Sequence, residues 1–322
     1  MMGTFIDTII VCTMTGLVLI AVILFMPQGV FGQFLRWRKE RGARQQPPAT
    51  ASASPTSSPA SPAPSPASGK AVGKAGDVLL KATGVRKSFK GVHALRGVDV
   101  EVRRGEILGL LGPKGSGKST FINVASGHYE VSAGTIEFNG RMISSGAAHR
   151  IAHDGIARTY QIPRPFAQLT VLQNVALPAM FGAASLDRHT AESQAWQWLE
   201  FTGLSSLAHA LPEALNLHQR KFLELARALA ARPQVLMLDE VLSGLTPSEI
   251  DEAVALIRRI RDQGATIVFV EHVMRAVMAL CDRIVVFNSG AVLAEGAPQD
   301  VMQRPEVVEA YLGHPKETAH AA

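Results

Sequence analysis

The sequence is poor in cysteine, in aromatic side chains and in net charge, and each shortage excludes a class of protein. Its two cysteines, Cys12 and Cys281, lie far apart in unlike contexts, which argues against a disulfide scaffold and fits a reducing compartment. Aromatic residues make up 6% of the chain, and the net charge is +5. A nucleic-acid-binding protein is expected to carry a basic stripe with interleaved aromatic residues, and we find none. We therefore expect no nucleic-acid partner.

The first part of the chain lacks charged residues. None occurs from residue 8 to residue 34, and the apolar run at residues 9–26 is long enough to cross a hydrocarbon core of about 30 Å as a helix. Basic residues follow at once, so the positive-inside bias predicts a cytoplasmic location for the C-terminal side. We predict a transmembrane segment with a basic flank over residues 1–45.

Two alternatives to this transmembrane segment stay open. A cleaved signal peptide fits less well, because no basic residue precedes the apolar run and no A-x-A site follows it. The third interpretation is a wrongly assigned start codon, with these residues never translated.

Residues 46–77 have a composition that cannot bury a core. Seven prolines lie between Pro47 and Pro66 among alanine and serine, and a Gly/Lys stretch follows. This composition is typical of an extended, disordered linker without secondary structure. Residues 315–322 are expected to form a flexible tail.

Residues 78–314 have the pattern of a globular α/β domain. Short apolar runs that indicate buried strands lie at residues 107–111, 235–238, 266–270 and 284–287. Helix-like segments alternate with these runs, which favours a mainly parallel sheet. Thr246-Pro247-Ser248-Glu249 is a capping box that predicts a helix ending at Gly264. Asn288-Ser289-Gly290 predicts a hairpin and therefore some antiparallel sheet.

The strongest chemical signal is a loop that fits the pattern G-x-x-x-x-G-K-[ST]. It reads Gly112-Pro113-Lys114-Gly115-Ser116-Gly117-Lys118-Ser119 and lies between a predicted strand and a predicted helix, as the motif requires. Backbone N–H groups can surround a phosphate only where side chains leave room, and the helix N-terminus adds a positive dipole. Lys118 is predicted to reach the β- and γ-phosphates of a nucleotide, and the Ser119 hydroxyl to bind Mg²⁺. The sequence contains no N-K-x-D motif, which disfavours a GTPase.

Two adjacent acids complete the predicted site. Asp239 and Glu240 follow an apolar strand, where carboxylates are costly unless they meet a cation or perform chemistry. Asp239 is predicted to hold Mg²⁺ through water, and Glu240 to polarise the water that attacks the γ-phosphate. The alternative is that both acids simply cap the next loop. ATP and Mg²⁺ are the expected ligands.

These segments resemble the nucleotide-binding subunit of ABC transporters. Gln161, in Arg158-Thr159-Tyr160-Gln161, is similar to the glutamine that links the γ-phosphate and Mg²⁺ to the membrane partner. His272 is similar to the family's switch histidine, which contacts the γ-phosphate, and Phe89 to the aromatic residue that stacks on adenine. The resemblance implies a RecA-like P-loop NTPase core with an antiparallel β subdomain near residues 78–105 and an α-helical subdomain near residues 165–230.

Four further segments are similar to the branched-chain or hydrophobic amino-acid uptake type of these transporters. They are HRIA at residues 149–152, GIART at 155–159, LCDRIVV at 280–286 and EAYLG at 309–313. Residues 24–32 also resemble the end of the last membrane helix of the cognate permease. The resemblance implies permease subunits and a second ATPase subunit as partners, and an external solute-binding protein indirectly. It places the ATPase on the cytoplasmic face of the inner membrane.

The family signature, Leu-Ser-Gly-Gly-Gln, is altered. The aligned residues are Leu215-Asn216-Leu217-His218-Gln219. Asn216 can replace the serine as a helix cap, but two glycines normally let the backbone approach the phosphate bound to the opposite subunit. His218 either donates to a phosphate oxygen or crowds it. We therefore hypothesise a heterodimer with a different ATPase, because both sites of a homodimer would be compromised.

The predicted site residues fall into three groups. The catalytic residues are Glu240, His272 and Gln161. The nucleotide-binding residues are Phe89, Gly112, Pro113, Lys114, Gly115, Ser116, Gly117, Lys118, Ser119, Thr120, Asn216, His218 and Gln219. The residues predicted to surround the metal are Ser119, Gln161 and Asp239.

Two other functional classes stay open, and one metal-site pattern is set aside. Soluble ABC ATPases of DNA repair or translation usually carry two tandem nucleotide-binding domains, whereas this chain has one phosphate loop. In a non-hydrolysing ATP-dependent clamp Glu240 would be a spectator, and the intact Glu240 and His272 argue against that function. His149 and His153 have the spacing of helical metal ligands, but no glutamate follows His149, so we interpret both as surface residues.

Overall fold

The computed structural model describes residues 76–312. The predicted transmembrane segment, almost all of the predicted linker and the predicted tail lie outside this range. Within it, no helix combines the length and the apolar character needed to span a bilayer.

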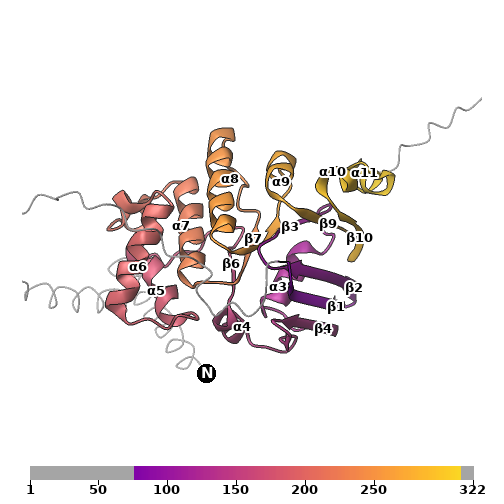
Figure 1. The fold of residues 1–322 in the computed structure, drawn as a ribbon, viewed down its shortest axis with the longest axis horizontal. Helices are drawn as coiled ribbons and strands as arrows, with labels where there is room; N and C mark the ends of the chain where they lie inside the picture. The colour runs from indigo at the N-terminus through magenta and orange to yellow at the C-terminus, as the bar shows by residue number, and fades with distance from the viewer. Residues whose placement is uncertain (1–75, 313–322) are drawn as a thin grey trace, which may run out of the picture. The chain divides into compact units, whose positions relative to one another are not determined.

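The larger sheet has six strands in the order β10-β9-β3-β8-β7-β6 (Figure 1). The strands are β3 (Ile107–Leu111), β6 (Ile156–Arg158), β7 (Val235–Asp239), β8 (Thr266–Val270), β9 (Arg283–Asn288) and β10 (Ala291–Gly296). Neighbouring strands are parallel, except that β9 and β10 form an antiparallel hairpin. Every residue of β3, β7 and β8 is buried, as expected for parallel strands covered on both faces. The strands and the hairpin predicted from the apolar runs are confirmed.

A second sheet has four antiparallel strands in the order β2-β1-β4-β5. They are β1 (Val78–Phe89), β2 (Val92–Arg103), β4 (Ala133–Phe138) and β5 (Arg141–Met142). The antiparallel subdomain predicted near residues 78–105 therefore also includes residues 133–142. In β4 only Ile136 and Phe138 are buried, which left no continuous apolar run to mark this strand in the sequence.

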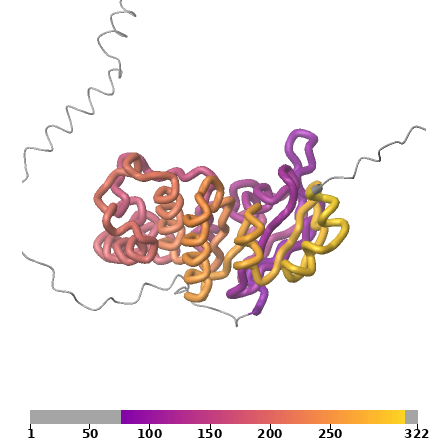
Figure 2. The backbone as a smooth tube through the Cα atoms, turned by 90° about the horizontal axis from the view of Figure 1, so that it is seen from above, coloured from indigo at the N-terminus to yellow at the C-terminus, as the bar shows by residue number. Residues whose placement is uncertain are grey.

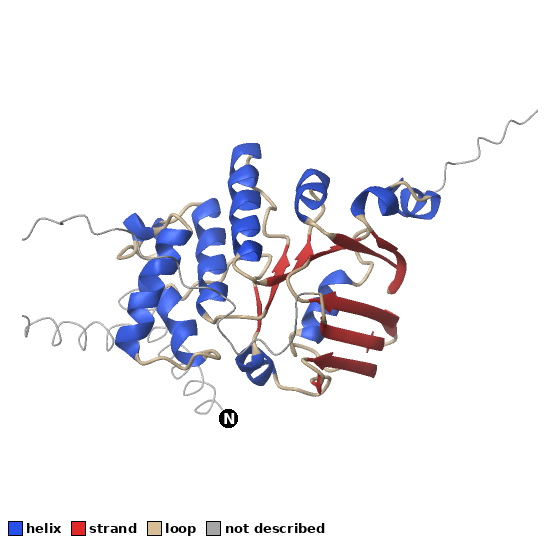
Figure 3. Cartoon of the chain, in the orientation of Figure 1, coloured by secondary structure: helices blue, strands red, loops and turns tan. Residues whose placement is uncertain are grey.

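Helices cover both sheets and form a separate helical subdomain (Figure 3). Those that pack around the sheets are α3 (Lys118–Ala125), α4 (Ala148–Asp154), α8 (Pro247–Asp262), α9 (Met274–Leu280), α10 (Pro298–Met302) and α11 (Pro305–Leu312). Those of the helical subdomain are α5 (Val171–Phe181), α6 (Arg188–Phe201) and α7 (Leu217–Ala230). The fully buried Trp198 of α6 belongs to its core. Figure 2 shows this subdomain at one end of the described region, with the antiparallel sheet and the C-terminal helices at the other.

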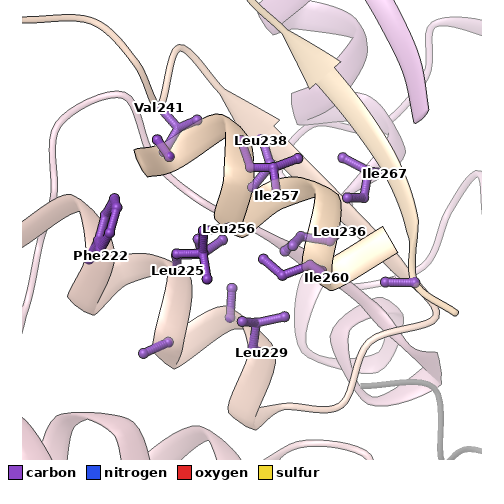
Figure 4. Packing of buried hydrophobic residues seen from close by; sticks show 14 of the residues in the cluster. Phe222, Leu225, Leu229, Leu236, Leu238, Val241, Leu256, Ile257, Ile260 and Ile267 are labelled. Carbon is purple, nitrogen blue, oxygen red and sulfur yellow. The ribbon is translucent and has the colours of Figure 1, made fainter. Parts of the chain in front are cut away.

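Two hydrophobic clusters hold these layers together. In the first, Leu225 and Leu229 of α7 meet Leu256, Ile257 and Ile260 of α8 above strands β7 and β8 (Figure 4). In the second, the buried face of α3 packs between the two sheets. The capping box predicted at Thr246 is present, because its hydroxyl accepts a hydrogen bond from the Glu249 N–H. This cap starts α8 and so places its apolar face on β7 and β8.

Candidate nucleotide-binding site

The phosphate loop is residues 112–117, between the end of β3 and the start of α3. Gly112 has φ +132°, and an added Cβ would lie 2.1 Å from the Phe287 carbonyl oxygen of β9. Gly117 has φ +109°, and its Cβ would lie 2.7 Å from the Ala94 carbonyl oxygen of β2. Only glycine fits both the backbone conformation and these close approaches. The loop is therefore wedged between β9 and β2.

Hydrogen bonds from other segments of the chain hold the phosphate loop in place. The Gly290 N–H, in the β9–β10 turn, donates to the Ser116 carbonyl at 3.0 Å. The Gly290 carbonyl in turn accepts from the Arg96 N–H of β2 at 2.8 Å. The Gly112 N–H donates to the Tyr311 hydroxyl of α11 at 2.7 Å. Segments from three distant parts of the sequence thus set the shape of the loop.

The Lys118 side chain folds back over the loop. Its ammonium donates to the carbonyls of Gly112 at 2.7 Å and Pro113 at 2.9 Å. Burial lowers the pKa of Lys118, and the nearby Glu240 and Asp239 carboxylates oppose this shift. The cation is therefore held against the loop by its carbonyls, where a phosphate would supply the negative charge. Of the remaining loop-motif residues, Ser116 is buried, Thr120 is half-buried, and Lys114, Gly115 and Ser119 are exposed.

Asp239 ends β7 and is 5% exposed. Burial raises the pKa of its carboxyl group, and the Arg158 guanidinium, 3.7 Å away, opposes that shift. Arg158 ends the neighbouring parallel strand β6 and also donates to the Asn123 side-chain oxygen of α3 at 2.6 Å. Arg158 is not among the residues predicted for the site, although its place at the end of a strand is a usable signal. It positions Asp239 beside the helix that follows the loop.

The three predicted catalytic residues lie after the ends of adjacent strands. The Gln161 side-chain N–H donates to a Glu240 carboxylate oxygen at 2.5 Å. Glu240 has φ +49°, a left-handed conformation that is uncommon for a residue with a side chain and is found at functional sites. His272 follows β8, with its side chain 67% exposed and its ring 3.9 Å from the buried Glu271 carboxylate. The structure therefore joins Gln161 to Glu240 and leaves the His272 ring accessible.

A cavity of about 320 Å³ collects the residues predicted to surround Mg²⁺. Its lining comprises Ser119, Asn123, His128, Arg158, Tyr160, Gln161, Ile162, Arg164 and Asp239. The hydroxyl, amide and carboxylate oxygens of Ser119, Gln161 and Asp239 are ligands that suit Mg²⁺. In the part of the chain that the structure describes, no cluster of three or more His, Cys, Asp or Glu side chains is placed to bind a metal. His149 and His153 are exposed, in agreement with their interpretation as surface residues.

Phe89 ends β1, and its ring is partly exposed. It meets the Tyr129 ring edge to face, with centroids 5.1 Å apart, and the Lys87 ammonium lies 5.0 Å from its centroid. Tyr129 is not among the residues predicted for this site. The pair forms an aromatic surface of the kind on which a base can stack.

The altered signature segment starts α7. Asn216 and Gln219 form a capping box, in which each side-chain oxygen accepts the other residue's backbone N–H, at 2.8 and 3.0 Å. The His218 ring packs on Phe222, with centroids 4.1 Å apart, and its Nε2 lies 3.6 Å from the Glu252 carboxylate of α8. Asn216 is thus a helix cap, as predicted, while His218 is directed to its own helix and α8.

A lysine of the same helix contacts the catalytic segment. Lys221 is 4% exposed, and its ammonium donates to the carbonyls of Glu240 at 3.2 Å and Val241 at 3.0 Å. Burial lowers the pKa of Lys221, whereas the carboxylates of Glu271 and Glu240 raise it. Lys221 is not among the residues predicted for the site, although Lys221, Leu225 and Leu229 follow at four-residue steps, which indicates the buried face of a helix. It ties α7 to the backbone of Glu240.

The parallel sheet, the glycine-rich loop at the end of β3 and the acids at the end of β7 define a P-loop nucleotide-binding protein. Comparison with known proteins identifies the family. The ABC transporter profile matches residues 95–243, and the branched-chain amino acid ATP-binding cassette transporter profile matches residues 291–317. The chain belongs to the family of ABC transporter ATP-binding proteins, within its branched-chain amino acid group.

Individual relatives agree with this assignment. The high-affinity branched-chain amino acid transport ATP-binding protein BraF of Pseudomonas aeruginosa is 34% identical over 249 residues, which cover 73% of this chain and 98% of BraF. The high-affinity branched-chain amino acid transport ATP-binding protein LivG of Escherichia coli K12 is 36% identical over 252 residues, which cover 73% of this chain and 98% of LivG. A crystal structure of a nucleotide-free ATP-binding cassette from an ABC transporter covers 74% of this chain, with TM-score 0.67 and 28% identity. An ADP conformation of such a cassette gives TM-score 0.66 and 29% identity.

Proposed function

We propose that this chain is the ATP-hydrolysing subunit of an ABC importer and couples hydrolysis to the uptake of branched-chain amino acids. The observation that carries the proposal is the cavity lined by Ser119, Gln161 and Asp239, with Gln161 hydrogen-bonded to Glu240 beside it. Membership of the branched-chain group supports the choice of solute.

In this proposal the chain's own residues divide the work on ATP. The loop N–H groups and Lys118 hold the β- and γ-phosphates, and Phe89 provides a surface for adenine. Glu240, the residue that follows β7, orients and polarises the attacking water with its carboxylate. Gln161 sets the position of that carboxylate through its hydrogen bond, and the exposed His272 ring contacts the γ-phosphate.

Mg²⁺ is the ion that we assign to the cavity. Ser119, Asp239 and Gln161 would hold it directly or through water, together with phosphate oxygens. When bound, it neutralises charge on the phosphates. Arg158 lies 3.7 Å from Asp239 and also donates to Asn123, so it links the Asp239 carboxylate to α3.

A permease subunit is the partner that we assign to the surface after Gln161. Ile162 is 69% exposed and Phe166 is 48% exposed. The Arg227 guanidinium lies 5.2 Å from the Phe166 ring centroid, so this apolar surface also carries a cation from α7. A short permease helix docked here would sense Gln161 directly. An external solute-binding protein would act through the permease.

We further propose a heterodimer with a second, different ATPase subunit. Leu217 and His218 occupy the positions of the two signature glycines, and His218 is packed against Phe222 and Glu252. The signature of one subunit serves the nucleotide of the other, so this chain's own phosphate loop depends on an intact signature in the partner. A homodimer of this chain would have two weakened sites.

The segments outside the described range complete the proposal. We propose that residues 1–45 form a membrane segment that resembles a permease tail and that residues 46–77 link it to the ATPase on the cytoplasmic face. Membrane fractionation of the full chain against a chain lacking residues 1–45 tests this part. Equal distribution of both between membrane and supernatant would contradict it.

Steady-state ATPase measurements test the proposed function. The full chain is assayed alone and mixed with candidate partner ATPase subunits, with Glu240→Gln as the matched control because it keeps size and hydrogen bonding. We expect activity in the mixture and its loss in Glu240→Gln. Strong activity of the isolated chain would overturn the weakened-signature heterodimer. Equal turnover by Glu240→Gln and wild type would favour the non-hydrolysing clamp.

A further inference from the structure

The sequence motif at residues 309–313 has no part in the function proposed above, yet it reaches the phosphate loop. Its tyrosine, Tyr311, belongs to α11, and the Tyr311 hydroxyl accepts the Gly112 N–H at 2.7 Å. The two residues are 199 positions apart in the chain. Gly112 is the first residue of the phosphate loop, so the last described helix is bonded to the start of the nucleotide site.

The local fold explains how Tyr311 arrives there. Val307, one helical turn before Tyr311, is fully buried and anchors the same face of α11. The Val307 N–H donates to the Arg304 carbonyl, and this bond fixes the start of the helix. Figure 1 shows α11 following α10 beside strand β10. The hairpin formed by β9 and β10 and the two helices after it therefore contact the loop twice, through Gly290 and through Tyr311.

Gly112 is held by hydrogen bonds on both sides of its backbone. A glycine has no side chain to restrict its backbone, and Gly112 holds φ +132°. Its carbonyl accepts from Lys118, and its N–H donates to Tyr311. The tyrosine hydroxyl thus fixes the orientation of the peptide group between Leu111 and Gly112. The carbonyl of Gly112, on the other side of the same residue, is the one that Lys118 contacts. Partial burial raises the pKa of Tyr311, and the hydrogen bond with the Gly112 N–H opposes this shift.

We propose that Tyr311 is a positioning residue of the phosphate loop, and that nucleotide affinity depends on this bond between the C-terminal helix and Gly112. The proposal rests on the proposed nucleotide-binding function. Tyr311 does not touch the reacting groups in this proposal. It acts through Gly112, by keeping the loop in the shape that accepts phosphate.

Tyr311→Phe tests the proposal, because it keeps the ring and removes only the hydroxyl. The matched control is Val308→Ala, a partly exposed position on the same helix. Affinity is measured on the full chain with a fluorescent ADP analogue and by competition with MgATP, and unfolding is followed without nucleotide. Loss of one hydrogen bond predicts about three- to tenfold weaker binding for Tyr311→Phe. In the ATPase assay KM should rise while kcat stays near wild type. Val308→Ala should bind as wild type does.

The outcomes separate the inference from the function on which it rests. Wild-type affinity in Tyr311→Phe, with or without a lower unfolding temperature, would overturn the inference, because the hydroxyl would then only fasten α11. A wild-type chain that binds no better than Lys118→Ala would overturn the proposed function itself. Hydrogen exchange provides a second measurement on the unmutated chain. Coupling between two sites is reciprocal, so ADP should slow exchange in α11, and unchanged exchange would contradict the proposal.

Discussion

Replacing Lys221 with methionine tests how the helical subdomain holds the catalytic segment. The substitution keeps the length and the apolar stem of the side chain and removes its charge. The lost ammonium donates to the carbonyls of Glu240 and Val241 in a site that is 4% exposed. Glu240 itself holds a left-handed backbone conformation, so its carbonyl is fixed at a strained position.

Opposing effects set how much Lys221→Met changes the free energy of unfolding. A hydrogen bond from a charged donor contributes about 1.5–3 kcal/mol, and a buried carbonyl left without a donor costs about 1–3 kcal/mol. The Glu240 carbonyl keeps a donor in the Ser243 N–H, so the larger loss falls on Val241. Methionine also avoids the desolvation that lowers the pKa of Lys221. We expect the balance to be a loss of about 1–3 kcal/mol in the free energy of unfolding.

Urea unfolding of the full chain measures this loss, and turnover by the complex measures its effect on catalysis. Without the Lys221 ammonium, Glu240 is expected to move by about half an ångström, and this displacement should lower kcat by about tenfold. The matched control is Arg220→Met, because Arg220 is the preceding residue and donates to the carbonyls of Leu215 and Glu213 instead. That change should cost about 0.5–1.5 kcal/mol and leave kcat close to wild type.

A methionine variant as stable as wild type would refute the reasoning. It would mean that the cost of burying the ammonium equals or exceeds what its hydrogen bonds return. Loss of stability with unchanged kcat would mean that Lys221 stabilises the fold but does not position Glu240 for catalysis.

Three further results are expected. Asn216→Ala should lower the free energy of unfolding by about 1 kcal/mol, as should Thr170→Ala, which removes the equivalent capping box of α5; unchanged urea midpoints would contradict this. Burial raises the pKa of Asp239 above 3.8, so the contribution of this carboxyl group to stability is full below pH 3.8 and is lost as pH rises through its folded-state pKa. The unfolding temperature of wild type relative to that of Asp239→Asn should therefore rise as pH falls from 7. Burial raises the pKa of Cys281 to about 12. In a Cys12→Ser chain at pH 8, a thiol reagent should therefore label Cys281 about a thousandfold more slowly in the folded chain than in the chain unfolded in urea. Fast labelling of the folded chain would contradict this expectation.

Elements with a local cause were predictable from the sequence. The runs predicted as strands at residues 107–111 and 266–270 have the same bounds in the structure, because fully buried parallel strands are apolar throughout. The capping box at Thr246 is also confirmed, and it was predictable because a cap and its helix are neighbours in sequence. Strand β4 was missed, because it is defined by pairing with β1 across a long separation and has only two buried side chains.

The site divides in the same way. The phosphate loop is one continuous segment whose spacing is set by a phosphate group, so its residues can be recognised from the sequence alone. The bonds from Lys221 to Glu240 and from Tyr311 to Gly112 span 19 and 199 positions, and no local rule brings those residues together. Periodicity does place Lys221 on the buried face of α7. What it contacts there depends on how α7 packs against the parallel sheet.

The turn between β9 and β10 has a consequence for ligand selection. Gly290 accepts a hydrogen bond from Arg96 of the antiparallel sheet and donates one to Ser116 of the phosphate loop, and both bonds use only backbone atoms. Phe89, the proposed base contact, stands at the end of the strand paired with β2. The two ends of a bound nucleotide would therefore be held by segments that backbone hydrogen bonds join to one another. A ligand whose ring and phosphates are a different distance apart can satisfy one end or the other but not both.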